Sequence, residues 1–241
     1  MTSRDHTTFE QHNKILNDDT ARAAYAAEHN GYRPALLPRL LGSFLILSGN
    51  VIYGKEPSYL KFRAVEIIAR VPYHSWDSAA YTLMTFFFFD EQRALSLAHT
   101  SRFARFAQDN ETMHIVVISR LAVFYEKIGL IRGSLIPLWF AFFYFWWSYT
   151  LYFINNRWSY ELNYLFEQHA YDQYSRFLEL EEEALRSRDV PSDYLAWYGR
   201  TPADQYEFFR SIRNDELIHR NESIEAIAAE KARRAAKGGK K

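Results

Sequence analysis

The stretches DNETMHIV (residues 109–116) and RNDELIHR (residues 213–220) each place a glutamate three positions before a histidine. Positions i and i+3 share one face of an α-helix, so each pair can aim a carboxylate and an imidazole at the same point. One such pair arises easily by chance on a charged helix surface. Two pairs, each directly preceded by a carboxylate or carboxamide side chain, indicate a common metal site. The pairs are Glu111 with His114, and Glu216 with His219.

The composition limits the classes of protein that the chain can belong to. Its 241 residues are 48% hydrophobic and carry no formal net charge, which argues against a disordered chain and against nucleic acid as a partner. There is no cysteine, so a metal must be held by oxygen and nitrogen ligands. Glycines are few and strictly alternating stretches are missing, which predicts an all-α fold. The helical segments are expected at about 57–71, 76–106, 108–130, 134–185 and 203–234.

A helical bundle that holds two iron ions needs two further carboxylates. Such bundles take a Glu-x-x-His motif from each of two helices and one glutamate from each of two others. Glu66 stands in an apolar segment, where an unpaired carboxylate would be costly, and Glu167 lies on an apolar helical stripe. The acidic run LEEEA (180–184) stands at a helix end and is interpreted as a solvated face. Six oxygen and nitrogen ligands on four helices suit iron or manganese.

Four segments of the chain resemble the ligand segments of the alternative oxidase family, in order and with similar spacing, and most closely those of its plastid terminal oxidase branch and bacterial relatives. They are VEIIARVPYHSW, NETMHI, EQHAYDQYSRFL and IRNDELIHR, and the resemblance covers residues 40–225. It implies a ferritin-like four-helix bundle with a non-haem di-iron centre. It also implies an enzyme that oxidises quinol, either ubiquinol or plastoquinol, and reduces dioxygen to water without pumping protons. The iron ligands it implies are Glu66, Glu111, His114, Glu167, Glu216 and His219.

The same resemblance suggests roles for residues around the metal. Tyr174 follows Glu167 by two helical turns and matches a tyrosine near the iron pair, although a buried core tyrosine is an equal alternative. Asn110 and Asp215 precede the two motif glutamates and are expected to orient the histidines, which usually donate their second N–H to a nearby oxygen. Lys61 stands where the mitochondrial branch has an arginine near the quinol pocket, so we predict a quinol contact there.

Two apolar stretches suggest a membrane surface. Residues 133–154 carry no charge and would form a helix of roughly 33 Å, long enough to cross a bilayer. A crossing there would put ligands of one metal pair on opposite sides of the membrane. We therefore expect the stretch to lead into a long bundle helix, with its outer side in the membrane interface together with residues 36–54. The prediction is a monotopic protein of a bacterial cytoplasmic membrane, with the thylakoid or the inner mitochondrial membrane as alternatives.

The sequence divides into a central domain and two flanks. Residues 1–35 are expected to form a polar, solvated arm, 36–225 the oxidase domain, and 226–241 a basic tail. Expected partners are quinol, dioxygen, membrane lipid and, in a homodimer, a second copy of the chain. Two other classes remain open. One is a soluble ferritin-like di-iron hydroxylase or ferroxidase, and the other is a metal-free helical membrane protein.

Overall fold

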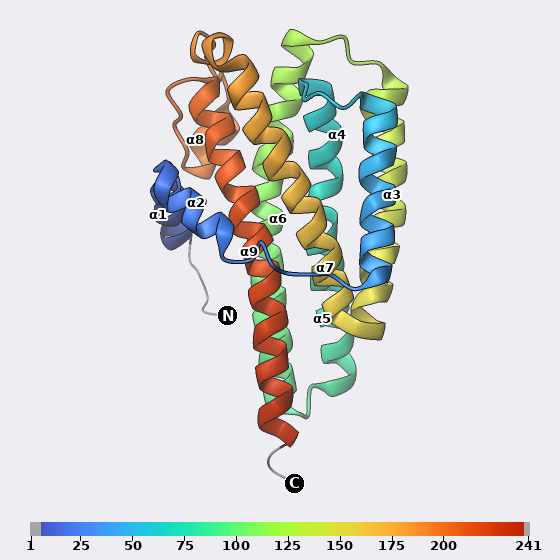
Figure 1. The fold of residues 1–241 in the computed structure, drawn as a ribbon. Coiled ribbons are helices and arrows are strands. Elements are labelled where there is room, and N and C mark those ends of the chain that lie inside the picture. Colours follow the sequence, from blue (N-terminus) through green and yellow to red (C-terminus); the bar gives the residue numbers. More distant parts are fainter. Residues whose placement is uncertain (1–5, 239–241) are drawn as a thin grey trace.

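The computed structural model describes residues 6–238, and within that range all regular structure is helical, which confirms the all-α prediction. Figure 1 shows long helices side by side, with two short N-terminal helices laid across one flank. In chain order the elements are α1 (His6–Ile15), α2 (Asp19–Ala27), α3 (Leu36–Tyr53), α4 (Tyr59–Ala69), α5 (Val71–Phe87), α6 (Glu91–Tyr125), a π-helical turn η1 (Ile131–Leu135), α7 (Ile136–Arg186), α8 (Asp193–Tyr198) and α9 (Gln205–Gly238).

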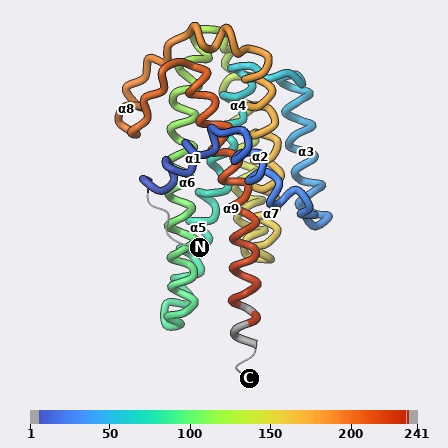
Figure 2. Tube along the Cα trace, turned by 60° about the vertical axis from the view of Figure 1, so that its left-hand side comes forward, coloured from blue at the N-terminus to red at the C-terminus, as the bar shows by residue number. Residues whose placement is uncertain are grey.

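The bundle around the core is built from α4 with α5, α6, the C-terminal part of α7, and α9. Helices α4 and α5 follow each other through Arg70, which keeps a helical backbone conformation. Pro72 lies in the first turn of α5, where a missing backbone N–H costs little. Figure 2 shows the hairpin of α5 and α6, and separately the C-terminal part of α9, extending below the rest of the bundle.

The expected helix boundary near residue 107 was wrong, because α6 runs unbroken from Glu91 to Tyr125. The true break lies at the end of α5, where the Asp90 side chain accepts a hydrogen bond from the backbone N–H of Arg93 at 3.0 Å and caps α6. Close to the expected boundary, Asn110 and Glu111 are fully buried on the inner face of α6.

The expected single long helix over 134–185 was also wrong. Asn155 has an extended backbone inside α7, and the chain reverses there, so segment 136–154 runs antiparallel to segment 156–186 (Figure 1). The hydroxyl of Ser148 lies 2.8 Å from that of Ser159 across the reversal. The Asn155 side chain accepts a hydrogen bond from the backbone N–H of Arg157 at 3.3 Å, which favours starting the second segment there. The first segment packs beside α3, outside the bundle.

The two flanks of the sequence differ from their predicted forms. In the expected solvated arm, Phe9, Leu16 and Tyr25 are buried against α9. Helix α9 continues through Ala226 to Gly238, so most of the predicted basic tail extends this helix. Residues 1–5 of the predicted arm and 239–241 of the predicted tail lie outside the described residues.

The turn before α7 depends on a glycine. A Cβ atom on Gly133 would lie 2.4 Å from the Cγ2 of Ile128, whereas one on Gly129 would meet nothing within 4 Å. We expect Gly133→Ala to lower the free energy of unfolding by about 1–3 kcal/mol, because the Ile128 side chain or the turn must shift. The control Gly129→Ala should change it by less than ~1 kcal/mol. Urea denaturation in detergent measures both, and equal stabilities would contradict the close approach.

Candidate metal centre

Six buried side chains from four helices meet in the middle of the bundle. Helix α4 supplies one glutamate, α6 a glutamate and a histidine, α7 one glutamate, and α9 a glutamate and a histidine. All six have no exposed surface. They are the six predicted ligands, Glu66, Glu111, His114, Glu167, Glu216 and His219, and the structure brings all of them together.

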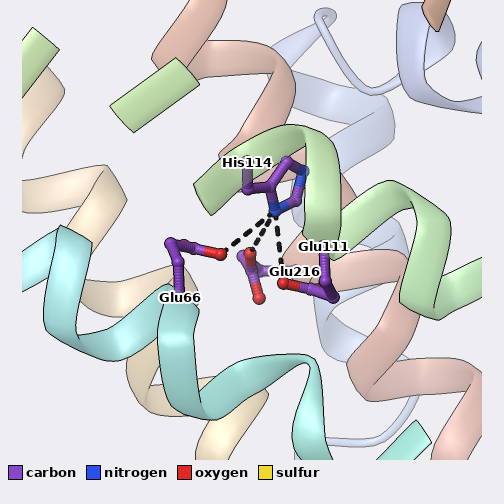
Figure 3. Close-up of side chains that lie close together, drawn as sticks. All are labelled: Glu66, Glu111, His114 and Glu216. Atoms are coloured by element: carbon purple, nitrogen blue, oxygen red, sulfur yellow. Dashed lines mark ion pairs between the residues drawn. The ribbon is translucent and has the colours of Figure 1, made fainter. Parts of the chain in front are cut away.

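The six residues form two overlapping groups, and in each group one ligand atom per residue lies within 4.8 Å of all the others. One group joins Glu66 and His114 with Glu111 and Glu216 (Figure 3), and the other joins Glu167 and His219 with the same two glutamates. The Nδ1 atom of His114 lies 3.3 Å from oxygens of both Glu66 and Glu111 and 3.4 Å from one of Glu216. Glu111 and Glu216 therefore stand between two potential ion positions.

The donor atoms of this cluster fit a pair of cations. Among the described residues, no hydrogen-bond partner exists for either oxygen of Glu216 or for one oxygen each of Glu66 and Glu167. Nδ1 of His219 faces Glu111, with one oxygen 2.8 Å away. Burial raises the pKa of Glu66 to about 7 and raises the pKa of Glu167 as well. Burial and the neighbouring carboxylates raise the pKa of Glu216 far above its usual range. Unpaired buried carboxylates are costly, and bound cations would remove that cost.

Asp215 supports the cluster from the next layer. One carboxylate oxygen lies 2.9 Å from Nε2 of His114, which fixes the tautomer that leaves Nδ1 free to bind a metal. Asn110 does not reach a histidine. Its amide donates to Asp215 at 3.2 Å and to the Tyr198 hydroxyl at 2.9 Å, so it acts on the histidine only through Asp215.

Each of the two glutamates outside the Glu-x-x-His motifs receives a hydrogen bond from a buried tyrosine. The predicted residue Tyr174 donates its hydroxyl proton to Glu66, and its ring stacks on Phe62 with centroids 4.1 Å apart. The hydroxyl of Tyr73 donates to Glu167 at 2.7 Å. Sequence reasoning missed Tyr73, although it follows Glu66 by seven residues just as Tyr174 follows Glu167.

Lys61 does not have the role that we predicted for it. Its ammonium group is 2% exposed and donates to Asn50 Oδ1 at 3.0 Å and to the carbonyl oxygens of Gly54 and Lys55 at 3.0 and 2.9 Å. These three bonds use all three protons. Lys61 therefore holds the end of α3 against α4 and offers no free donor to a quinol.

The fold and the cluster define a four-helix bundle built around a buried carboxylate and histidine site. The sequence model of the alternative oxidase family matches residues 62–227, which include every helix that contributes to the cluster. The chain belongs to the alternative oxidase family. It is 26% identical over 193 residues, 68% of the chain, to ubiquinol oxidase 4 of Arabidopsis thaliana, a chloroplastic and chromoplastic protein, and spans about half the length of that relative. No solved structure matches the chain.

The overlap of the two groups predicts unequal effects of losing single carboxylates. Glu216→Ala should abolish retention of both metal ions, because Glu216 belongs to both groups, whereas Glu167→Ala should leave about one of about two ions per chain. The exposed Glu182→Ala is the control and should retain the parental content. Elemental analysis of iron-loaded, desalted protein measures the content. Equal iron in the Glu216 and control variants would exclude this cluster as the site.

Proposed function

We propose that the protein is a membrane-attached quinol oxidase that holds two iron ions and reduces dioxygen to water without pumping protons. The buried cluster of four carboxylates and two imidazoles is the observation that carries the proposal. Membership of the alternative oxidase family and similarity to a ubiquinol oxidase support it. The substrate class is a lipid-soluble quinol such as ubiquinol or plastoquinol.

Each residue of the cluster and its surroundings would have a distinct role in this reaction. Glu66, Glu167 and the two motif pairs would hold the irons, which when bound supply electron transfer to dioxygen. The complete burial of the cluster keeps bulk water from the reacting atoms. Tyr174 holds its hydroxyl proton against Glu66 and can deliver that proton beside the site where oxygen is reduced.

An exposed apolar surface favours attachment to a membrane. On α3, exposed apolar side chains recur every three or four residues and form one stripe. Segment 136–154 lies beside α3 and exposes further aromatic and aliphatic side chains, so the two form one flank (Figure 1). An exposed apolar area of this kind is unusual on a soluble protein. The stripe of α3 consists of Leu36, Leu40, Phe44, Leu47 and Val51, and segment 136–154 adds Leu138, Trp139, Phe142, Phe143 and Trp146.

Attachment to one leaflet fits this flank better than a crossing. Among the described residues, only α3 is long and apolar enough to cross a membrane, with a mean hydropathy of 1.4. Segment 136–154 belongs to the stretch 133–154 that we expected to be long and apolar enough to cross a bilayer, but it does not meet that measure. Its tryptophan and tyrosine side chains suit the membrane interface. A soluble di-iron hydroxylase or ferroxidase would share the metal cluster, but the class does not account for the exposed apolar side chains of α3 and segment 136–154.

Oxygen consumption tests the proposed reaction. Iron-loaded protein in detergent should consume dioxygen when given ubiquinol or plastoquinol analogues, with no hydrogen peroxide accumulating. Glu111→Ala should abolish that consumption, because Glu111 belongs to both metal groups. Iron-loaded parental protein that oxidises no quinol but hydroxylates a substrate or oxidises ferrous iron would favour the soluble di-iron class.

Removing a hydroxyl tests the role of Tyr174. Tyr174→Phe keeps the ring that stacks on Phe62 and removes the donor to Glu66, so turnover should fall by at least about tenfold while iron stays bound. The matched control is Tyr144→Phe. Tyr144 is equally buried on α7, but its hydroxyl has no hydrogen-bond partner among the described residues. Parental turnover in the Tyr174 variant would leave that residue with a packing role alone.

A charge on the apolar flank tests membrane attachment. Leu47 on the α3 stripe is 64% exposed, and Leu180 near the far end of α7 is 56% exposed. Leu47→Lys should weaken binding to lipid vesicles, because a charge buried in the interface is costly, whereas Leu180→Lys should bind like the parent. Co-sedimentation with vesicles measures both. Equal binding of the two variants would place the membrane surface elsewhere.

A further inference from the structure

Helix α1 lies outside the four-helix bundle, yet its side chains reach the layer around both histidines of the metal centre. It packs along α9 beside the cluster (Figures 1 and 2). Phe9 has no exposed surface, and its ring centroid lies 5.8 Å from that of His219. The Tyr73 ring lies 5.4 Å from the same histidine. His219 Nδ1 lies 2.8 Å from an oxygen of Glu111, while its Nε2 has no hydrogen-bond partner among the described residues, so on the Nε2 side the imidazole is held by ring packing.

The other histidine is tied to α1 through Asp215. Besides the contact with His114, the Asp215 carboxylate accepts a hydrogen bond from the Asn13 amide at 2.6 Å. It also accepts two from the Arg200 guanidinium, at 2.5 and 2.9 Å. Arg200 is in turn held by Glu10 of α1, with its Nε 3.0 Å from both carboxylate oxygens and its Nη2 2.7 Å from one of them.

These contacts form a continuous chain of charged groups from α1 to the metal site. The side chain of Arg200 is 5% exposed and lies between the carboxylates of Glu10 and Asp215. Bidentate guanidinium pairs of this kind restrict both distance and orientation. Asp215 therefore cannot rotate away from His114 without breaking contacts with Asn13 and Arg200. Sequence reasoning missed this chain of contacts, because Asn13 lies 202 residues before Asp215, and Glu10 lies 190 residues before Arg200.

We propose that α1 and Arg200 are positioning elements of the metal centre. In this arrangement, Asn13, Glu10 and Arg200 hold Asp215 so that His114 keeps its binding tautomer and direction, and Phe9 holds the ring of His219. The identity of the metal rests on the proposed function. Loss of outer contacts to ligand histidines typically costs ten- to a hundredfold in metal affinity.

The alternative is that α1 only covers the bundle. Apolar side chains at 16 and 25 pack with Phe9 against Leu217 and Ile218 and would stabilise the fold in either case. The test must therefore measure metal retention separately from stability. Three variants each change one side chain: Arg200→Lys removes the guanidinium fork between Glu10 and Asp215, Asn13→Leu removes the amide that donates to Asp215 and to the carbonyl of Ser211, and Phe9→Leu removes the aromatic ring. The control is Asp19→Asn, which breaks an exposed ion pair with Arg22 on the neighbouring helix α2.

The experiment measures iron release without quinol. Full-length protein in detergent is loaded anaerobically with Fe²⁺ and mixed with excess ferrous chelator, and the coloured complex is followed in time. Release should be about 10–100-fold faster for Arg200→Lys and Asn13→Leu, about tenfold faster for Phe9→Leu, and parental for Asp19→Asn. Thermal unfolding of each metal-free variant is recorded alongside. With Co²⁺ in place of iron, the visible absorption band should shift in the three variants and stay unchanged in the control.

Parental release rates and parental Co²⁺ spectra in all three variants would overturn the proposal, whatever their thermal stability. Faster release that also appeared in Asp19→Asn would overturn it too, because it would follow from general loosening of the N-terminal helices. Since no quinol is used, a parent that retains iron but oxidises no quinol contradicts the proposed function and leaves this inference standing.

Discussion

Four carboxylates buried within reach of one another are the constraint on which this structure depends. Burial and mutual repulsion both oppose their ionisation, and the two imidazoles offset only part of that cost. The pKa of Glu111 is held low by His114 and His219 against its burial, while that of Glu216 is raised. Bound cations would offset the remaining electrostatic cost of the four carboxylates. The hydrogen bonds that Tyr73, Tyr174 and Asp215 make with the cluster hold its side chains in place.

The reversal at Asn155 separates the polar centre of the bundle from the apolar flank on its outside. If segment 136–154 continued straight into segment 156–186, its exposed aromatic side chains would extend far beyond the bundle. Folding it back places it against α3, where Tyr144 and Leu151 pack with Leu45. The exposed apolar flank and Glu167 therefore come from neighbouring segments of the sequence but lie in separate layers of the molecule.

The ligand residues could be predicted from the sequence because helical spacing alone places a glutamate and a histidine on one face, and because Glu66 and Glu167 are carboxylates in apolar surroundings. The reversal of α7 could not, since one extended residue inside an apolar stretch leaves no periodic signal. The roles of Lys61 and Arg200 depend on partners that only the tertiary fold brings close. The break at 88–90 was missed because neither glycine nor proline marks it and apolar residues lead directly into it.

The tyrosine contacts expose an approximate twofold relation within the site. Glu66 and Glu167, the two glutamates outside the motifs, are each followed by a tyrosine seven residues later. The pairing is crossed, because Tyr73 donates to Glu167 and Tyr174 donates to Glu66. The relation fails at the histidines. Asp215, which precedes the second motif, forms a hydrogen bond with the imidazole of His114 in the first motif. Asn110 precedes the first motif, but it donates to Asp215 and not to His219. The two halves of the cluster are therefore chemically distinct, because the imidazole of His114 has a carboxylate behind it and the imidazole of His219 has only aromatic rings there. His219 is thus the histidine with more freedom to tilt about its contact with Glu111.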